Sequence, residues 1–497
     1  MKKISLLIVT IFFVSITSCS DFLEEDLHGT YSSATFYKTE AHALLAVSAI
    51  YNIASFSSTD NALWVFGDVA SDDAIKGGNP GDQSDIQFID EFNYPRSNGY
   101  IEKIWKYYYE GISRANYLLY YGPTISMDEN LKSRVLGEAK FLRAYFYFNL
   151  VNIFGEIPLK LNPPLTNAEI NVAKSPVASI YAQIEKDLQE AAQVLETTFE
   201  GTDLGRATKG AAYGLLAKAS LYQQKWDETL VAITSLEALG LYALENSYKN
   251  NFMDSTQNNQ ESIFEIQHLK GQIPKLGNSL NQWFAPVSEN GYYFNVPVQD
   301  FVDEFEKTAG EISDPRLDYT VGREGQKWLN GEDFNPGWSP TGYLQKKHLQ
   351  PLREVPRGLK GDGDLNYVYL RYSDILLMKA EALNELNRPG EALIPLNAVR
   401  KRARESYLYD PDLTGFGAIP EGLLPDVTTT DQGILREAIR HERRVELGFE
   451  FHRYFDLMRY GKQAAEAALA GTGFVYEQNR YFLIPQSEID TNPAISE

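Results

Sequence analysis

Apolar residues recur at helical spacing along most of the chain. Residues 100–121 carry one continuous apolar stripe, formed by Ile101, Ile104, Trp105, Tyr108, Ile112 and Ala115. Residues three and four apart share one face of an α-helix, so this spacing predicts an amphipathic helix. The same spacing predicts helices over residues 40–55, 131–154, 176–199, 208–224, 226–239, 372–387, 390–405, 431–448 and 450–470. The chain is therefore predicted to be mostly α.

The predicted helices from residue 208 onward fall into pairs. The pairs are 208–224 with 226–239, 372–387 with 390–405, and 431–448 with 450–470. Small residues such as Ala211 and Gly214 lie on the first helix of one pair, where they allow close helix approach. Paired helices of about 34 residues resemble tetratricopeptide repeats, although these pairs are degenerate and scattered. We expect a tetratricopeptide-like helical-repeat scaffold.

Three long stretches, residues 67–98, 249–371 and 410–430, lack a sustained helical pattern. Connections of this length in a compact protein are usually either functional or disordered. Their content of Trp, Tyr and Phe argues against disorder. We expect them to form long ligand-binding loops, with a minor amount of β structure.

The N-terminus has the pattern of an export signal. Lys2 and Lys3 precede an apolar run over residues 4–16, which is short for a membrane span. The run ends in Ile16-Thr17-Ser18-Cys19, which resembles a bacterial lipobox. The resemblance implies a signal peptide over residues 1–18, cleavage before Cys19, and attachment of a lipid anchor to its thiol. An ordinary secretory signal with a chance cysteine is the alternative.

The composition narrows the class of ligand. The chain contains 46 Lys and Arg against 67 Asp and Glu, which gives a formal net charge of −21. Binding to nucleic acid depends on Lys and Arg contacts to phosphate, so we expect no nucleic-acid partner. A single Cys excludes internal disulfides and any multi-thiolate metal site. We expect neither a metal ion nor a cofactor.

One helix begins like a zinc-protease motif. His441-Glu442 would need a second His at position 445, and that position is Val. Glu442 instead shares the apolar stripe of residues 431–448, and a buried carboxylate needs a cationic or hydrogen-bonding partner. We therefore predict a structural ion pair for Glu442, with partners among the nearby Arg440, Arg443, Arg444, Arg453 and Arg459.

Two further sequence features, a calcium-loop-like segment and the many possible carboxylate pairs, give little evidence for a functional site. Asp362-Gly-Asp-Leu-Asn366 begins like a calcium loop, but Tyr367 and Ser373 stand where the loop needs Gly and a bidentate Glu. We expect a turn, with extracellular calcium as the alternative. A glycoside hydrolase needs two carboxylates at a set separation. A chain with 67 acidic residues offers many such pairs, so their presence does not discriminate.

Four tryptophans lie outside the predicted helices, namely Trp64, Trp283, Trp328 and Trp338. Sugar rings stack their C–H faces on aromatic planes, while their hydroxyls bind neighbouring polar side chains. Trp328 and Trp338 lie in a segment rich in Gly, Asn and Asp, and Trp283 precedes Tyr292. We predict that Trp283, Trp328, Trp338 and Tyr292 include the main sugar platform, with Trp64 as a further candidate. The alternative is that each Trp anchors its own loop to the core.

Longer motifs across the chain resemble those of the SusD/RagB family. They are GEAKFLRAYFYF from residue 137, FGEIPL from 154, RATKGAAYGLLAKA from 206, LRYSDILLMKAEA from 370, IRHERRVELGFEFHRYFDLMR from 439 and LIPQSEIDTNP from 483. The resemblance implies a SusD-like N-terminal region over 19–270 and a C-terminal region over 271–497. Within the latter, 271–370 would form a loop-rich ligand face and 371–497 would be helical.

The family resemblance also implies a function and partners. It implies a lipid-anchored, surface-exposed outer-membrane protein of Bacteroidetes that caps a SusC-like TonB-dependent transporter. Residues 68–78 resemble a segment near the ligand-facing loop of the family, which makes Asp72 and Asp73 candidate acceptors for sugar hydroxyls. Arg371, at the start of a predicted helix, is a third polar candidate.

We therefore expect a glycan-binding lipoprotein without enzymatic activity, which captures an oligosaccharide and delivers it to the transporter for nutrient uptake. A peptide nutrient is an alternative within the same family. A surface glycoside hydrolase and a protein-binding helical-repeat scaffold are the rival classes.

Overall fold

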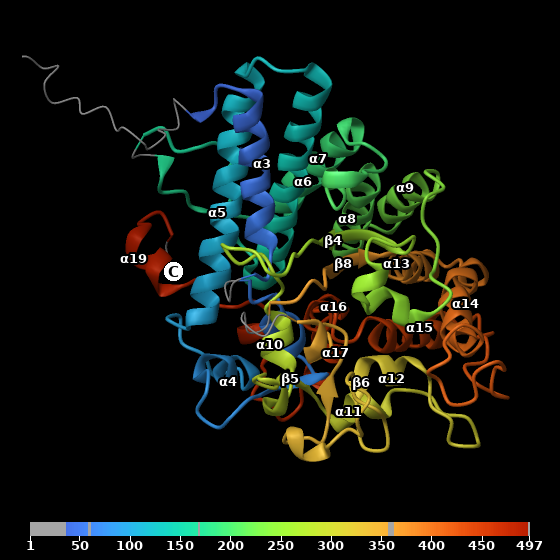
Figure 1. The fold of residues 1–497 in the computed structure, drawn as a ribbon. Coiled ribbons are helices and arrows are strands. Elements are labelled where there is room, and N and C mark those ends of the chain that lie inside the picture. The colour runs from blue at the N-terminus through green and yellow to red at the C-terminus, as the bar shows by residue number, and fades with distance from the viewer. Residues whose placement is uncertain (1–35, 58–60, 167–168, 356–361, 496–497) are drawn as a thin grey trace, which may run out of the picture.

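The structure, a computed structural model, describes residues 36–57, 61–166, 169–355 and 362–495. The predicted lipobox with Cys19 lies outside these residues. Four long helices form the N-terminal part and pack in chain order, each against the next (Figure 1). They are α3 (Glu40–Ala54), α5 (Gly99–Tyr121), α6 (Glu129–Phe154) and α7 (Val177–Val194). Trp105 of α5 is buried in the core, as its place on the apolar stripe predicts.

Two helical hairpins continue the scaffold. They consist of α8 (Lys209–Tyr222) with α9 (Trp226–Glu237), and α13 (Tyr372–Glu385) with α14 (Pro389–Glu405). α9 packs on α13, so the two hairpins adjoin although some 130 residues of chain separate them (Figure 1). The prediction of a mostly α, helical-repeat fold with minor β is confirmed.

The third predicted helix pair, residues 431–448 with 450–470, does not form a hairpin. α15 (Gln432–Leu447) packs mainly on α13, while the segment over 450–470 divides into α16 (Arg453–Tyr460) and α17 (Lys462–Ala468). The break is at Gly461, whose φ of 96° is a conformation that glycine adopts readily and other residues do not. α16 contacts a π-helical turn at Val65–Val69 instead of forming a hairpin with α15.

The helix predicted over residues 176–199 is shorter in the structure. α7 stops at Val194 because Leu195 is already extended, so the helix ends five residues before the predicted limit of 199. At its start, Pro176 takes the cap position, and Ser175 before it lies in strand β3 (Lys174–Ser175). By contrast, Asn98, Asp128, Thr208 and Asp431 accept backbone N–H groups at the starts of their helices, as N-caps do.

Short helices and short strands form within the long stretches that lack a sustained helical pattern. Their short helices are α4 (Ser84–Asp90), α10 (Leu280–Phe284), α11 (Gln299–Asp303) and α12 (Arg316–Thr320). The described residues form four two-stranded antiparallel sheets, and β2 (Ile157–Pro158) pairs with β3 in the first. The others pair β1 (Ala74–Gly77) with β5 (Phe294–Pro297), β4 (Ser262–Ile266) with β8 (Tyr367–Arg371), and β6 (Val321–Gly322) with β7 (Leu344–Gln345). The chain ends in α18 (Tyr476–Asn479) and α19 (Gln486–Thr491).

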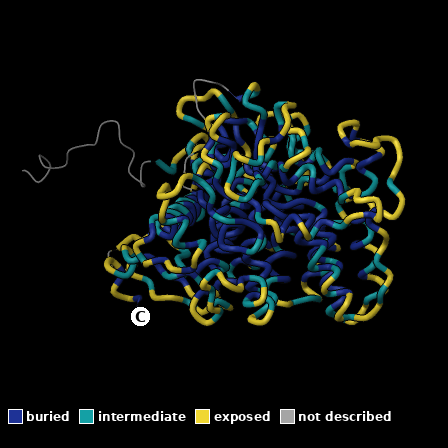
Figure 2. The backbone as a smooth tube through the Cα atoms, turned by 90° about the horizontal axis from the view of Figure 1, so that it is seen from below, coloured by how far each residue is buried: buried dark blue, intermediate teal, exposed yellow. Residues whose placement is uncertain are grey.

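Buried residues fill the centre of the molecule, and exposed residues gather on the peripheral loops and helix ends (Figure 2). One large hydrophobic core includes side chains from the N-terminal helices, from the short elements and from α16. The rigid scaffold can therefore hold loops in defined positions. Among the described residues, no helix has both the length and the apolar composition needed to cross a bilayer.

Candidate functional site

A cavity of about 430 Å³ opens beside Trp283 and Tyr292. We call it the aromatic pocket. Its walls include Asp82, Gln83, Lys275, Gln282, Trp283 and Tyr292. Its size falls in the range of small-ligand sites, and its lining combines aromatic planes with hydrogen-bonding groups.

Three aromatic side chains at the pocket contact one another in order of increasing exposure, with tilted and edge-on ring geometry. Trp64 is 2% exposed, Trp283 is 8% exposed and Tyr292 is 42% exposed. The ring centroids lie 5.8 Å apart for the first pair and 5.7 Å apart for the second. Trp64 supports Trp283 from inside the core, and Trp283 in turn supports Tyr292 at the mouth of the pocket. The prediction that Trp64 contacts ligand is therefore wrong in this structure, because Trp283 and the core bury its ring.

Hydrogen bonds and a strand pair fix the position of Tyr292. Its backbone N–H donates to the carbonyl oxygen of Gln282 at 2.9 Å, and the Gln282 amide donates to the Tyr292 hydroxyl at 2.9 Å. The following residues enter β5, which pairs with β1 in the register Ala74↔Pro297. A side chain at Gly77 would collide with the carbonyl oxygen of Tyr293, at 2.2 Å, so the two strands can approach only because Gly77 has no Cβ.

The other two predicted tryptophans lie elsewhere. Trp328 is 2% exposed and contacts Phe334 and Trp338 edge-on or tilted, with centroids 5.6 and 5.8 Å away. Its indole N–H donates to Glu289 Oε1 at 3.0 Å. Trp338 is partly buried, and neither ring is among the described residues that line the aromatic pocket. The residues predicted to include the platform thus lie in two places: Trp283 contacts Tyr292, whereas Trp328 packs against Trp338.

Asp72 and Asp73 bind arginines of the scaffold instead of facing a ligand. Asp72 accepts two hydrogen bonds from Arg453, both at 2.7 Å, and Asp73 Oδ1 accepts from Arg444 at 2.8 Å. Burial raises the pKa of Asp72, but Arg453 and Arg444 outweigh burial and lower it overall. Burial dominates for Asp73 and raises its pKa to about 6. The prediction that these carboxylates accept sugar hydroxyls is corrected, because both are already bonded to arginine inside the protein.

Arg371 is also internal, with 1% of its surface exposed. Its guanidinium donates to Glu261 at 2.9 Å and to both oxygens of Glu450 at 2.8 Å. It also bonds the carboxylate of Glu446. A ligand at the surface cannot reach this group, so the predicted polar contact at Arg371 is corrected to a structural one.

The predicted ion pair of Glu442 is confirmed, but its partners are not the expected ones. Glu442 is fully buried and binds Arg316 at 2.6 Å and Arg400 at 2.8 Å. Both arginines are more than 40 residues away, because a side chain on the buried face of a helix meets other elements and not its own chain neighbours. No catalytic role is needed to explain this carboxylate.

The segment that resembles a calcium loop is held by the protein itself. Asp362 accepts the backbone N–H of Gly271 at 2.7 Å, and Asp364 binds the Lys270 ammonium at 2.6 Å. Across the described ranges of the chain, no cluster of three or more His, Cys, Asp or Glu side chains has the arrangement to hold a metal ion.

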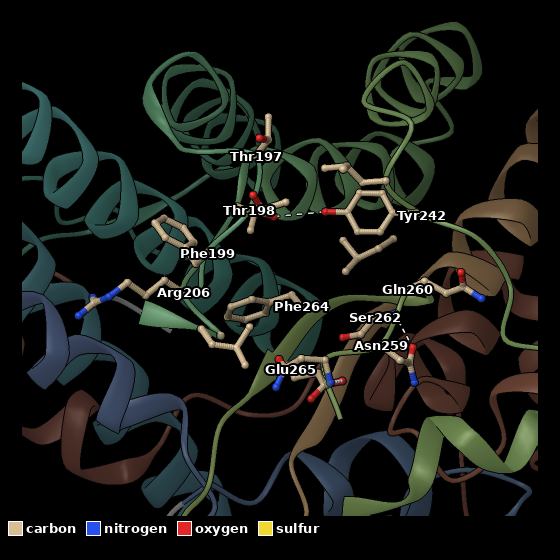
Figure 3. A pocket seen from close by; sticks show the side chains of 16 residues that line it. Thr197, Thr198, Phe199, Arg206, Tyr242, Asn259, Gln260, Ser262, Phe264 and Glu265 are labelled. Carbon is tan, nitrogen blue, oxygen red and sulfur yellow. Dashed lines mark hydrogen bonds between the residues drawn. The ribbon is translucent and has the colours of Figure 1, made fainter. Parts of the chain in front are cut away.

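A further pocket of about 250 Å³ lies between residues 197–208 and strand β4 (Figure 3). Phe199 and Tyr242 line it, together with Asn259 and Gln260. The side-chain oxygen of Asn259 already accepts the N–H groups of two following residues, and the Gln260 amide donates to a backbone carbonyl at 3.3 Å. These amides are engaged within the protein, so this pocket offers a ligand fewer open partners than the aromatic pocket.

Sequence reasoning missed the polar wall of the aromatic pocket, formed by Asp82, Gln83, Lys275 and Gln282. Gln282 was adjacent to the predicted Trp283 and could have been named from that position alone. Asp82 and Gln83 come from a segment some 200 residues earlier, and the β1–β5 pairing brings them near. The local sequence pattern gives no indication of that strand pairing.

The structure combines a helical-repeat scaffold with an aromatic pocket on its loops, which is the arrangement of a binding protein. Comparison with known proteins identifies the family. The family model described as "SusD family" matches residues 260–497, and the one described as "Starch-binding associating with outer membrane" matches residues 25–221. The chain belongs to the SusD family. The description of the second model points to association with the outer membrane.

Individual relatives agree along nearly the whole chain. SusD-like protein P25 of Formosa agariphila is 28% identical, over 92% of this chain and 90% of its own. The solved structure of a laminarin-binding SusD-like protein is 29% identical with a TM-score of 0.77, and the match covers 93% of this chain and 99% of that one. A SusD-like carbohydrate-binding protein from Bacteroides fragilis is 26% identical with a TM-score of 0.78, covering 93% and 100%.

Proposed function

We propose that this protein is a cell-surface glycan-binding lipoprotein that captures an oligosaccharide in the aromatic pocket and delivers it to a SusC-like TonB-dependent transporter. The observation that carries the proposal is the row of contacting aromatic rings, Trp64, Trp283 and Tyr292, which runs from the core to the pocket. A rigid, half-exposed aromatic ring with amide and charged groups beside it offers both contacts that a sugar requires. The carbohydrate-binding relatives of similar fold support the same assignment.

The lining of the pocket favours binding over hydrolysis. Among the described residues of the wall, Asp82 is the one carboxylate. A glycoside hydrolase generally needs two carboxylates flanking the scissile bond. We therefore propose that the glycan is bound and passed on intact. Shortened products after incubation with the glycan would instead support the hydrolase alternative.

Replacing Tyr292 by alanine is expected to weaken glycan binding by about tenfold to a hundredfold, as loss of a central aromatic contact commonly does. Because Tyr292 is 42% exposed, the melting temperature should change little. The measurement is calorimetric titration against a panel of oligosaccharides, with a thermal melt of each variant.

Tyr120→Ala is the matched control for this experiment. Tyr120 is 47% exposed on α5 and lies outside the lining of the aromatic pocket. Its loss should leave affinity unchanged. If Tyr292→Ala binds every glycan of the panel as tightly as the Tyr120 variant, the aromatic pocket is not the capture site.

Replacing Cys19 by alanine is expected to abolish incorporation of radiolabelled palmitate and to release the protein from the membrane fraction. The reason is that Cys19 is the only thiol of the chain and stands at the end of the lipobox-like motif. Stable anchoring requires more than one acyl chain, so loss of the modified residue should remove the anchor completely. A wild-type protein that takes up no label, or a mature chain that begins elsewhere, would contradict the lipoprotein assignment.

A further inference from the structure

A larger cavity of about 770 Å³ lies apart from the aromatic pocket. We call it the second pocket. It is bounded by the turn at residues 249–254, by residues 318–331, by residues 346–354 and by residues 412–414. It shares no lining residue with the aromatic pocket among those described. Its volume suits a ligand of one to a few sugar residues.

Lys346 gives the second pocket an ammonium group that forms no ion pair with a described carboxylate. Its Nζ donates to the backbone carbonyl oxygen of Asp318 at 2.6 Å, and no carboxylate of the described chain forms an ion pair with it. Burial lowers the pKa of Lys346 to about 8. A largely desolvated ammonium is stabilised when a carboxylate or other anion comes within contact distance.

Gln350 adds an unpaired donor to the wall of the second pocket. Its Oε1 accepts the backbone N–H groups of Asp364 at 2.9 Å and Leu365 at 3.1 Å, which fixes the orientation of the amide. The Nε2 group is buried and has no hydrogen-bond partner. A buried donor without an acceptor is costly, and a ligand oxygen placed against it recovers that cost.

The acidic residues of the lining are mostly neutralised by the protein. Asp412 binds Lys249, Asp318 binds Arg323, and Glu354 binds Arg353 at 3.4 Å. Asp254 is the lining carboxylate that forms no ion pair with another described residue. Lys346 and Gln350 are therefore the lining donors for which a ligand carboxylate would supply a missing partner, and Asp254 is the lining acid outside the ion pairs.

The apolar part of the wall suits a sugar ring. Phe252, Trp328 and Leu349 line the second pocket. Trp328 also bonds Glu289, which lies on the segment between Trp283 and Tyr292 of the aromatic pocket. Both pockets are thus built on the same connected set of loops.

We propose that the second pocket binds a sugar residue that carries a carboxylate, with Lys346 and Gln350 as the groups that recognise the acid. The glycan would then be an acidic one, containing uronate units. This inference rests on the proposed glycan-binding function and adds the chemical class of the ligand.

The test is calorimetric titration of the intact protein with tetragalacturonate, with a glucuronate-containing tetrasaccharide, and with the neutral methyl ester of each. The acid form is expected to bind at least about tenfold more tightly than its ester. Lys346→Met keeps the apolar stem of the side chain and should remove that preference. Asp254→Asn removes the unpaired acid and should strengthen binding of the acid form.

The outcomes separate this inference from the proposed function. Equal affinity for acid and ester, no binding of either acid probe, or unchanged binding by Lys346→Met with an unchanged melting temperature would each overturn the second pocket as an acid site. Acid binding that is lost in Tyr292→Ala and kept in Lys346→Met would overturn it too, because the ligand would then occupy the aromatic pocket. In each case, neutral glycan binding that depends on Tyr292 would leave the proposed function standing.

Discussion

Replacing Arg371 by leucine is expected to lower the free energy of unfolding by about 3–5 kcal/mol, the usual effect of removing one partner from a buried ion pair. Arg371 is the shared partner of Glu261, Glu446 and Glu450. Burial raises the pKa of Glu450, but Arg371 and Lys347 outweigh burial and hold it at about 2. Without Arg371, the three carboxylates lose a common cation in a site that water does not reach.

The measurement is the midpoint of urea unfolding, followed by circular dichroism. Arg388→Leu is the control, because Arg388 also binds a carboxylate, that of Glu391 at 2.6 Å, yet both side chains are about half exposed. Exposed pairs contribute little, so the control should keep the wild-type midpoint. Arg371→Lys keeps the charge but loses the planar fork and should fall between the two. Equal midpoints for the Arg371 and Arg388 leucine variants would refute a stabilising role for the buried network.

The helices were largely predictable because their apolar faces are long and regular. Residues 100–121 and α5 differ by one residue at the start, since the stripe through Ile101 and Tyr108 covers the whole element. The prediction failed where one residue decides the backbone, as at Gly461, where a continuous helix over 450–470 is broken. One glycine with a positive φ ends a helix, but it hardly changes the spacing of the apolar residues in the sequence, so the pattern alone does not show the break.

The candidate site was predictable only in part, for a different reason. Local composition pointed to Trp283 and Tyr292, because aromatic residues in polar loops stand out in the sequence. It also pointed to Arg371, which is internal because acidic residues from distant segments, such as Glu261 and Glu450, surround it. Burial of a charged side chain depends on long-range partners, and these follow from the fold and not from the local pattern.

Three buried histidines are expected to lower the stability of the fold as the pH drops from about 6.5 to about 5, whereas carboxylates with raised pKa values, such as Asp73 and Asp90, act in the opposite direction over this range. Burial lowers the pKa of His268 to about 3 and that of His348 to about 4. Burial, together with the nearby Lys218, lowers the pKa of His452 to about 3. Two of these rings act as acceptors, because His268 Nε2 accepts the N–H of Phe56 at 3.0 Å and His452 Nδ1 accepts the Lys218 ammonium at 3.1 Å. Protonation would remove the lone pair that each of these bonds requires.

The direction of the pH effect on stability depends on whether the folded or the unfolded state binds more protons. A histidine in the unfolded chain takes up a proton below its ordinary pKa of about 6.5, whereas these rings stay neutral in the folded protein until the pH approaches their lowered values. Each should therefore contribute its full stability above about pH 6.5 and lose about 2 kcal/mol of it by pH 5. His268→Gln keeps an acceptor for Phe56 but cannot titrate, so it should remove about a third of the loss shared by the three histidines. Urea unfolding at pH 7.5 and pH 5.0 measures the difference, and a His268→Gln variant with the full wild-type pH dependence would show that His268 is not one of its sources.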